Sequence, residues 1–230
     1  AALLAQMLPG SVAILATAPE VPRNSDCDYP YRHDSYFYYL SGFTEPDSAL
    51  ALVAASATAP ARAILFCRPK NAEREIWDGF RHGPEAARTA FGFDAAFPIE
   101  ERDVEMARLL ADAPALYYAL GGSLDAQVRG WLHGVRQKAR SGVTAPAMAI
   151  DVNGMLDAMR LLKDPQELSL MRRAAAISSA GHARAMRAAR PGMHEYALEA
   201  ELLYEFRRSG AQFPAYSSIV AGGDNACILH

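Results

Sequence analysis

The sequence predicts an α/β N-terminal domain, in which helices flank a mixed β-sheet, followed by a region that begins with helices and ends in a β-hairpin. In the first part, short apolar runs bounded by Gly, Pro, Asp or Ser alternate with segments whose apolar residues recur at helical spacing. Such alternation is typical of helices that cover a sheet. The chain has 230 residues, 51% of them apolar, so each of two domains can bury a core.

The candidate strands are short runs of aliphatic and aromatic residues. The run Ser11–Thr17 lies between Pro9-Gly10 and Pro19, and its length favours a buried strand over a helix. The stretch 18–34, with its prolines and charges, is expected to be an irregular surface loop. Further candidate strands are Tyr36–Leu40, Ala49–Val53, Ala63–Phe66 and Leu116–Ala119.

Helical spacing of apolar residues predicts helices over 85–91, 104–110 and 124–139. The stretch 144–154 is expected to connect two domains, and a short helix is predicted over 155–162. The first long helix then has a clear beginning, because Asp164 suits the N-cap, Pro165 the first turn and Glu167 the capping box.

Two helices and a hairpin are predicted for the rest of the chain. Residues 190–192, Arg-Pro-Gly, end the first helix, and a second runs from about His194 to Ser209. Apolar runs flanking residues 221–225 predict a β-hairpin, because Gly, Asp and Asn tolerate the positive φ of a tight turn. Alternation along the last strand then places His230 on the same face as Ile228.

Composition argues against several classes of protein. The formal net charge is −3 and basic residues are mixed with acidic ones, so no nucleic-acid partner is expected. No apolar run is long enough to span a membrane, and the first residues suit a helix start better than a signal peptide. The odd, widely spaced cysteines, Cys27, Cys67 and Cys227, predict reduced thiols and a cytoplasmic location.

Several polar groups have a structural explanation that we prefer to a functional one. The acids and histidine of residues 26–34 are expected to be a solvated loop rather than a metal cluster. His182 and His194 lack companions at metal-ligand spacing and are expected to be surface or structural residues. The glutamates at 195, 199, 201 and 205 predict a solvated helix face with the neighbouring arginines.

The chain resembles the aminopeptidase P family in several segments whose order and spacing also match: 23–32, 34–46, 75–79, 159–163 and 213–230. The resemblance implies a creatinase-type N-terminal domain over residues 1–154. It also implies that residues 155–230 form the first part of a pita-bread metallopeptidase domain of the α+β class. On this comparison the chain stops just inside the second domain.

The resemblance implies release of the N-terminal residue from peptides with proline in the second position. In the family, two divalent metal ions, usually Mn²⁺, share a hydroxide that attacks the carbonyl before proline. The family's metal ligands correspond to positions downstream of His230, so we expect this polypeptide to bind no metal and to be inactive alone. Proline-containing peptide substrates and a homo-oligomer, a dimer or tetramer, are the implied partners, with no nucleic acid and no membrane.

The resemblance also implies roles for individual residues. His230 matches a histidine that contacts substrate or intermediate, and the alternative is a frayed end of the chain. Trp77 matches a tryptophan that closes a neighbouring subunit's active site, and the alternative is a packing role. Arg140 matches, more loosely, an arginine near the active site. Tyr216 and Asn225 are expected to shape the substrate pocket, although packing and turn formation explain both without chemistry.

Three functions of different classes remain open from the sequence. The first is a proline-specific metalloaminopeptidase. The second is a hydrolase of the same fold with another substrate, such as a prolidase or a creatinase. The third is a metal-free peptide-binding module. The stretches 34–46 and 75–79 favour the first, and the presence of two Asp, a His and two Glu downstream would exclude the third.

Overall fold

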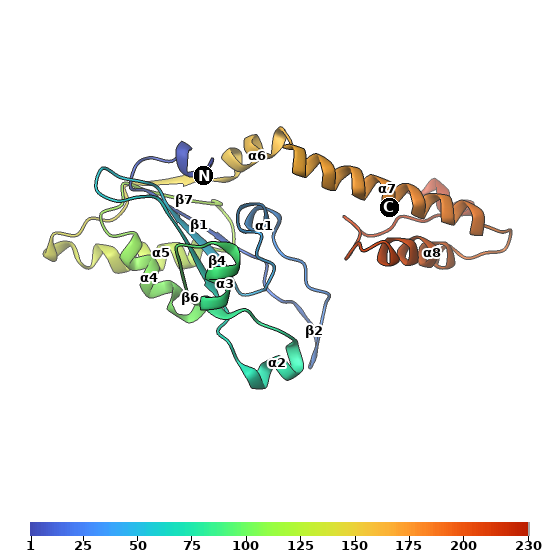
Figure 1. Ribbon diagram of the computed structural model, residues 1–230, viewed down its shortest axis with the longest axis horizontal. Helices are drawn as coiled ribbons and strands as arrows, with labels where there is room; N and C mark the ends of the chain where they lie inside the picture. The colour runs from blue at the N-terminus through green and yellow to red at the C-terminus, as the bar shows by residue number, and fades with distance from the viewer. Residues whose placement is uncertain (230) are drawn as a thin grey trace. The chain divides into compact units, whose positions relative to one another are not determined.

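The computed structural model describes residues 1–229 and divides into two compact units, Ala1–Leu161 and Leu162–His230 (Figure 1). The first unit is built on a six-stranded sheet with the order β6-β5-β4-β1-β7-β8. Strand β4 is antiparallel to both of its neighbours, whereas β5 and β6, β1 and β7, and β7 and β8 are parallel pairs. The prediction of a mixed sheet is therefore confirmed. The strands are β1 (Val12–Ala16), β4 (Ala49–Val53), β5 (Arg62–Cys67), β6 (Ala95–Pro98), β7 (Ala115–Tyr118) and β8 (Met148–Asp151).

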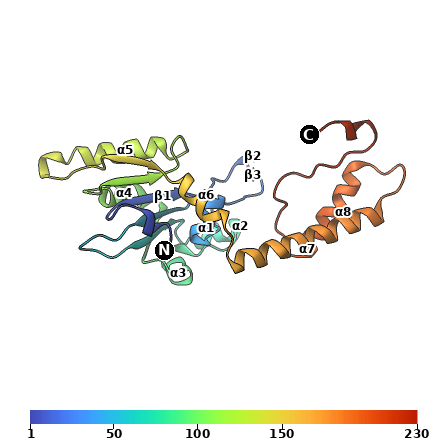
Figure 2. The ribbon, with the colours of Figure 1, turned by 90° about the horizontal axis from the view of Figure 1, so that it is seen from above.

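Helices cover both faces of the sheet. Side chains alternate along each strand, so each strand contributes residues to two separate cores. On one face, residues such as Leu15 and Leu50 join a core that includes Phe37 and Leu156. On the other face, residues such as Ile14 join a core with the helices that carry Met106 and Trp131. Figure 2 shows α5 on one side of the sheet and α3 on the other. The first unit is thus a three-layer α/β/α domain.

The helices of the first unit agree with the predicted ones within a few residues, and two further helices were not predicted as such. The α-helices are α1 (Ser35–Ser41), α2 (Ala72–Asp78), α3 (Gly83–Phe91), α4 (Arg102–Leu109), α5 (Asp125–Arg136) and α6 (Asn153–Leu161). Short 3-10 helices are η1 (Leu4–Gln6), η2 (Ile99–Glu101) and η3 (Ala139–Ser141).

The prediction of a strand at Tyr36–Leu40 is wrong, because this segment is helix α1. The Asp34 carboxylate caps the helix by accepting hydrogen bonds from the backbone N–H groups of Tyr36 and Phe37, at 2.9 and 2.8 Å. Gly42 ends it in the left-handed conformation, with φ +66°. Caps at both ends favour a short helix here over the β-propensity of the aromatic residues.

Four other segments of the first unit differ from the predictions. The expected irregular loop 18–34 contains a two-stranded sheet, β2 (Pro22–Asn24) and β3 (Cys27–Asp28). Helix α2, which was not predicted, contains Trp77, and the Asn71 side chain caps it by accepting a hydrogen bond from the N–H of Arg74 at 3.0 Å. Strand β6 was not predicted, and strand β8 lies within the expected connecting stretch.

The second unit begins with two helices, α7 (Pro165–Ala188) and α8 (Glu195–Arg208). The predicted capping box is confirmed: Asp164 accepts from the N–H groups of Gln166 and Glu167, and Glu167 accepts from the N–H of Asp164. The helices pack closely where Gly181 leaves room for the ring of Phe206. Helix α7 stops before residues 190–192, as predicted.

The predicted β-hairpin at the end of the chain is wrong for the described residues. Residues 209–229 contain no strand, and 3-10 helix η4 (Gly223–Cys227) occupies the expected turn. Gly223 does take the positive φ expected of the turn, +58°. The flanking apolar runs find no strand to pair with in the described part of the chain, and an isolated two-stranded hairpin is marginal in water.

Of the helices in the described residues, none combines the length and apolar character required to cross a membrane.

Candidate functional site

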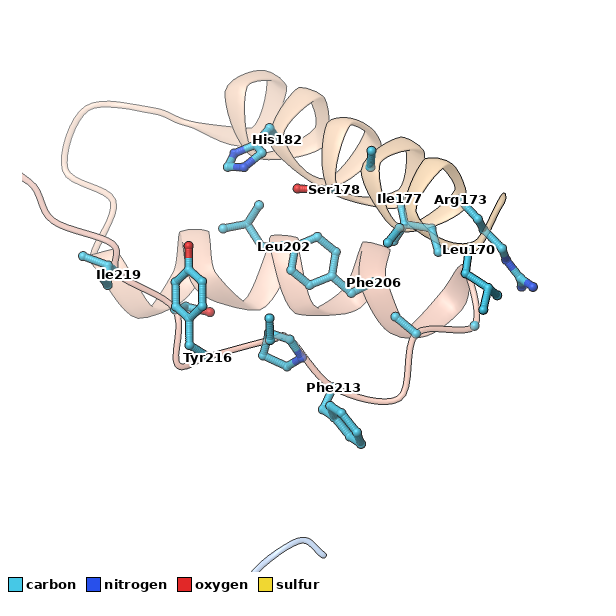
Figure 3. A pocket seen from close by; sticks show the side chains of 17 residues that line it. Leu170, Arg173, Ile177, Ser178, His182, Leu202, Phe206, Phe213, Tyr216 and Ile219 are labelled. Atoms are coloured by element: carbon cyan, nitrogen blue, oxygen red, sulfur yellow. The ribbon is translucent and has the colours of Figure 1, made fainter. Parts of the chain in front are cut away.

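The second unit contains a cavity of about 720 Å³ between α7, α8 and the segment that follows α8 (Figure 3). Its walls are largely apolar. In Figure 3 the side chain of Tyr216 rises from this segment toward Leu202, beside the ring of Phe206. Tyr216 is 75% exposed, and its hydroxyl makes no hydrogen bond within residues 1–229. The cavity therefore presents an apolar surface and an available phenol to a ligand.

Polar side chains line one wall of this cavity. Helix α7 contributes Arg173, Ser178 and His182 to the lining, and the sticks of Figure 3 show His182 and Ser178 above Leu202. His182 is exposed, in agreement with the expectation of a surface residue, and it also lines the cavity. Four-residue spacing of Ser178 and His182 on a helix is the signal that places both on one face.

Ion pairs hold α7 against α8. Arg184 donates to Glu201 at 2.6 Å and lies 4.0 Å from Glu205, which also pairs with Arg208 at 2.9 Å. Glu205 is only 6% exposed, so the prediction of a solvated face is wrong at this position. A buried carboxylate needs such partners, because an unpaired buried charge is strongly destabilising.

Glu195, the first residue of α8, fixes the segment that leads to the end of the chain. Its Oε1 atom accepts a hydrogen bond from the N–H of Gly222 at 2.7 Å and from Nδ2 of Asn225 at 3.0 Å. The Asn225 side chain, and then the Gly222 backbone, hold the pKa of the Glu195 carboxyl below its usual value. Asn225, expected to shape a pocket or a turn, binds Glu195, and both line a second, polar cavity of about 550 Å³.

Trp77 lies on α2 of the first unit, with its side chain in solvent. It is 81% exposed, and its neighbours Ile76 and Phe80 are 80% and 69% exposed. Protein surfaces rarely expose three large apolar side chains on one short segment. Aromatic residues are enriched at interfaces between proteins. These three residues, Ile76, Trp77 and Phe80, form an apolar patch that is not buried within the first unit.

A network of charges fixes the connection between α2 and α3. The ammonium group of Lys70 donates to Glu75 Oε1 at 2.7 Å and to the carbonyl of Arg81 at 2.6 Å. Glu75 Oε1 also accepts from the N–H of Arg81 at 2.7 Å. Glu45 holds the next residue, accepting from the N–H of His82 at 2.8 Å and lying 2.6 Å from its Nδ1. The sequence does not predict this network, because three of its five contacts involve backbone atoms.

The other predicted site residues are not brought together by the first unit. Arg140 lies on η3, which follows α5, and its side chain is exposed. Figures 1 and 2 show α2 and the end of α5 on different sides of the first unit, so Trp77 and Arg140 do not share a site within it. Tyr216 belongs to the second unit, and His230 lies outside the described residues.

The described residues do not form a metal centre. Within residues 1–229, no group of three or more His, Cys, Asp or Glu side chains is arranged to hold a metal ion. The described residues provide an apolar cavity, a loop anchored by Glu195 and an exposed apolar patch.

Comparison with protein-family models gives two matches in chain order. Residues 1–117 match the N-terminal domain of aminopeptidase P, and residues 169–230 match metallopeptidase family M24. The chain is 42% identical to the Xaa-Pro aminopeptidase of Escherichia coli K12 over 231 aligned residues and 41% identical to that of Haemophilus influenzae over 228. These alignments cover 100% and 99% of this chain but 52% and 50% of the relatives, so the chain spans about half their length.

Solved structures agree with the sequence comparisons. The structure is similar to zinc-substituted E. coli aminopeptidase P in complex with product, with a TM-score of 0.95 and 42% identity, and to proline aminopeptidase P II from Yersinia pestis, with a TM-score of 0.95 and 45% identity. Both comparisons cover 100% of this chain, and 52% and 53% of the solved chains. The chain therefore belongs to the aminopeptidase P family, with an aminopeptidase P N-terminal domain followed by sequence of metallopeptidase family M24.

Proposed function

We propose that the protein is an Xaa-Pro aminopeptidase, which hydrolyses the bond between the first residue of a peptide and a proline in the second position. The observation that carries the proposal is the match of the whole chain to named Xaa-Pro aminopeptidases at 42% identity, with a TM-score of 0.95 across both units. Fold alone would not support an activity. Here the alignment with a named relative covers 100% of this chain.

Divalent metal ions are part of the proposal, with two Mn²⁺ ions as the first candidate. Metallopeptidase family M24 and the zinc-substituted relative support divalent metals. The ions would supply an activated water and stabilise the charge that develops during attack. No group of three or more potential ligands lies together among residues 1–229, so we assign to the residues described here roles toward the peptide rather than the metal.

Four residues carry the proposed substrate contacts. We assign to His230 a hydrogen bond to the charge that develops on the scissile carbonyl, as its family match implies. Tyr216 presents its phenol at the apolar cavity, where it would orient the peptide. Arg140, an exposed cation on η3, would bind carbonyl or carboxylate groups of the peptide. Trp77 would limit access to the site from a neighbouring subunit.

A homo-oligomer, a dimer or tetramer, is the proposed assembly, and the apolar patch on α2 supports it. Large aromatic side chains that cost little in conformational entropy are the usual anchors of such interfaces. The free thiols of Cys27, Cys67 and Cys227 fit a reducing compartment, and we place the enzyme in the cytoplasm. Neither a nucleic acid nor a membrane is a proposed partner.

The test is an assay of the protein expressed from its complete gene, loaded with Mn²⁺. We expect it to release the first residue from an Xaa-Pro-Xaa tripeptide and to lose this activity when a chelator removes the metal. The matched peptide with alanine in place of proline is the specificity control. Hydrolysis of an Xaa-Pro dipeptide alone would identify a prolidase, and peptide binding without hydrolysis would identify a binding module. Either result would refute the proposal.

A further inference from the structure

The hydrogen bonds of Glu195 join two parts of the second unit that are far apart in sequence. Glu195 is in the first turn of α8, and its partners Gly222 and Asn225 lie 27 and 30 residues further along the chain. One carboxylate oxygen, Oε1, accepts both hydrogen bonds, at 2.7 and 3.0 Å. The first bond holds the residue before η4, and the second holds a side chain inside it.

This contact is the main tether of an otherwise exposed segment. Residues 221–229 are all exposed, and η4 has no buried residue. The turn also requires a glycine-type backbone conformation, because Gly223 has φ +58°, which costs most other residues energy. With little apolar burial to hold this segment, its position depends on polar contacts, and Glu195 provides both of the side-chain hydrogen bonds made to it by the described residues.

The position of Glu195 keeps its carboxylate charged. Aligned peptide dipoles favour negative charge in the first turn of a helix. Hydrogen bonds from Asn225 and Gly222 also favour the ionised form. Charge-assisted hydrogen bonds are about twice as strong as neutral ones, so one side chain can hold the turn without a hydrophobic contact.

We propose that Glu195 is a positioning residue of the peptidase site: through Gly222 and Asn225 it fixes the turn 222–227, which leads directly to the residue we propose to contact the substrate, His230. This inference rests on the proposed function. Glu195 itself contacts no reacting atom in this assignment. Its effect on turnover comes from the placement of the segment after the turn, and a misplacement of about 1 Å in an active-site group can lower turnover about a hundredfold.

The test compares variants of Glu195 in the protein expressed from its complete gene and loaded with Mn²⁺. Glu195→Ala removes both hydrogen bonds and is expected to lower kcat about tenfold to a hundredfold with little change in KM. Glu195→Gln keeps an oxygen within reach and should lose only about two- to fivefold. Glu195→Asp keeps the charge but shortens the side chain, so it should resemble the alanine variant. Asn225→Ala removes one of the two hydrogen bonds while leaving Glu195 in place, so it tests the same contact independently.

Glu199→Gln is the matched control. Glu199 lies one turn further along α8 and lines the same polar cavity, but its carboxylate makes no hydrogen bond within residues 1–229. The same chemical change at this position should leave kcat within about twofold of the parent.

Amide hydrogen exchange of residues 218–227 provides a readout that is independent of activity. We expect faster exchange there in Glu195→Ala and Asn225→Ala than in the parent and in Glu199→Gln. Unchanged exchange would overturn the inference, as would a kcat for Glu195→Ala equal to that of the control. If the parent cleaves no Xaa-Pro peptide, the proposed function fails separately, and the exchange comparison decides whether Glu195 anchors the turn.

Discussion

Gly181 of α7 and Phe206 of α8 meet so closely that a Cβ atom on Gly181 would lie 2.5 Å from Cε1 of the phenyl ring. The absence of a side chain at Gly181 therefore lets the two helices pack around one aromatic ring. The same ring lines the cavity that contains Tyr216. A single contact thus determines both the packing of the helix pair and the shape of the candidate binding surface.

Gly181→Ala should destabilise the protein. Overpacking costs about 1–3 kcal/mol, which exceeds the gain of up to about 1 kcal/mol from replacing a helical glycine. Thermal or urea unfolding measures the change, and Gly134→Ala on α5 is the control. No atom lies within 4 Å of a Cβ at Gly134, so that variant should gain stability. Destabilisation by Gly181→Ala that persisted undiminished in a Phe206→Leu background would show that the ring is not the cause.

His230→Ala is expected to lower kcat about a hundred- to a thousandfold, because a donor aimed at developing charge contributes that much to turnover. Metal content and melting temperature should stay near those of the parent, since the proposed role involves the substrate alone. Steady-state kinetics and metal analysis of the complete enzyme are the measurements. A parallel fall in metal occupancy would assign the residue to the metal site, and a rise in KM alone would assign it to ground-state binding.

Trp77→Ala should weaken the oligomer without weakening the fold. A buried interface tryptophan contributes about 2 kcal/mol or more to association, which corresponds to a dissociation constant raised at least about thirtyfold. The free energy of unfolding of the first unit should change by less than about 0.5 kcal/mol, since the indole is 81% exposed. Light scattering across a dilution series tests the assembly. Val104→Ala, an exposed apolar position on α4 that is 56% exposed, is the control, and equal behaviour of the two variants would remove the special role of Trp77.

Cys67 should resist thiol reagents in the folded protein, whereas Cys27 and Cys227 should react. Burial raises the pKa of the Cys67 thiol to about 12, from an ordinary value of 9.0, and Cys27 and Cys227 are exposed. Labelling at pH 8 followed by peptide mapping measures the difference. The raised pKa also predicts that stability falls as pH rises above about 9, because the unfolded thiol then releases its proton while the folded one keeps it. Rapid modification of Cys67 at pH 8 would contradict the burial found for β5.

A polypeptide of residues 1–230 is expected to show no Xaa-Pro peptidase activity by itself. Residues 1–229 contain no cluster of potential ligands for a metal ion, and the proposed mechanism needs a metal-activated water. The assay is the release of the first residue from an Xaa-Pro tripeptide with Mn²⁺ present. Turnover that a chelator abolishes would disprove this expectation.

The strands and long helices of the chain could be predicted from sequence where one local signal dominates. The capping box of Asp164 and Glu167 fixes the start of α7 through bonds that involve only four consecutive residues. At Tyr36–Leu40 two local signals conflict: the aromatic run favours a strand, whereas Asp34 and Gly42 are helix caps. The caps were the better guide, because they satisfy backbone groups that a strand would have to pair with a neighbour.

The candidate site was less predictable than the fold. Tyr216 was expected at a pocket, but the pocket itself depends on the ring of Phe206 and on the fit of α7 against α8, which is a tertiary contact. The network of Lys70 and Glu75 involves backbone atoms of Arg81, and no residue pattern encodes such partners. The predicted hairpin before His230 failed for a related reason, since glycines beside Asp224 suit several kinds of turn.

The strand order of the first unit has a consequence for how the protein is made on the ribosome. In chain order, β4 joins one edge of β1, β5 joins β4, and β6 joins β5; then β7 joins the other edge of β1, and β8 joins β7. Every new strand therefore meets an edge that is still open, and no strand has to be inserted between two already paired neighbours. The sheet can assemble in the direction of synthesis, with its first strand becoming its centre and its last strand closing one side.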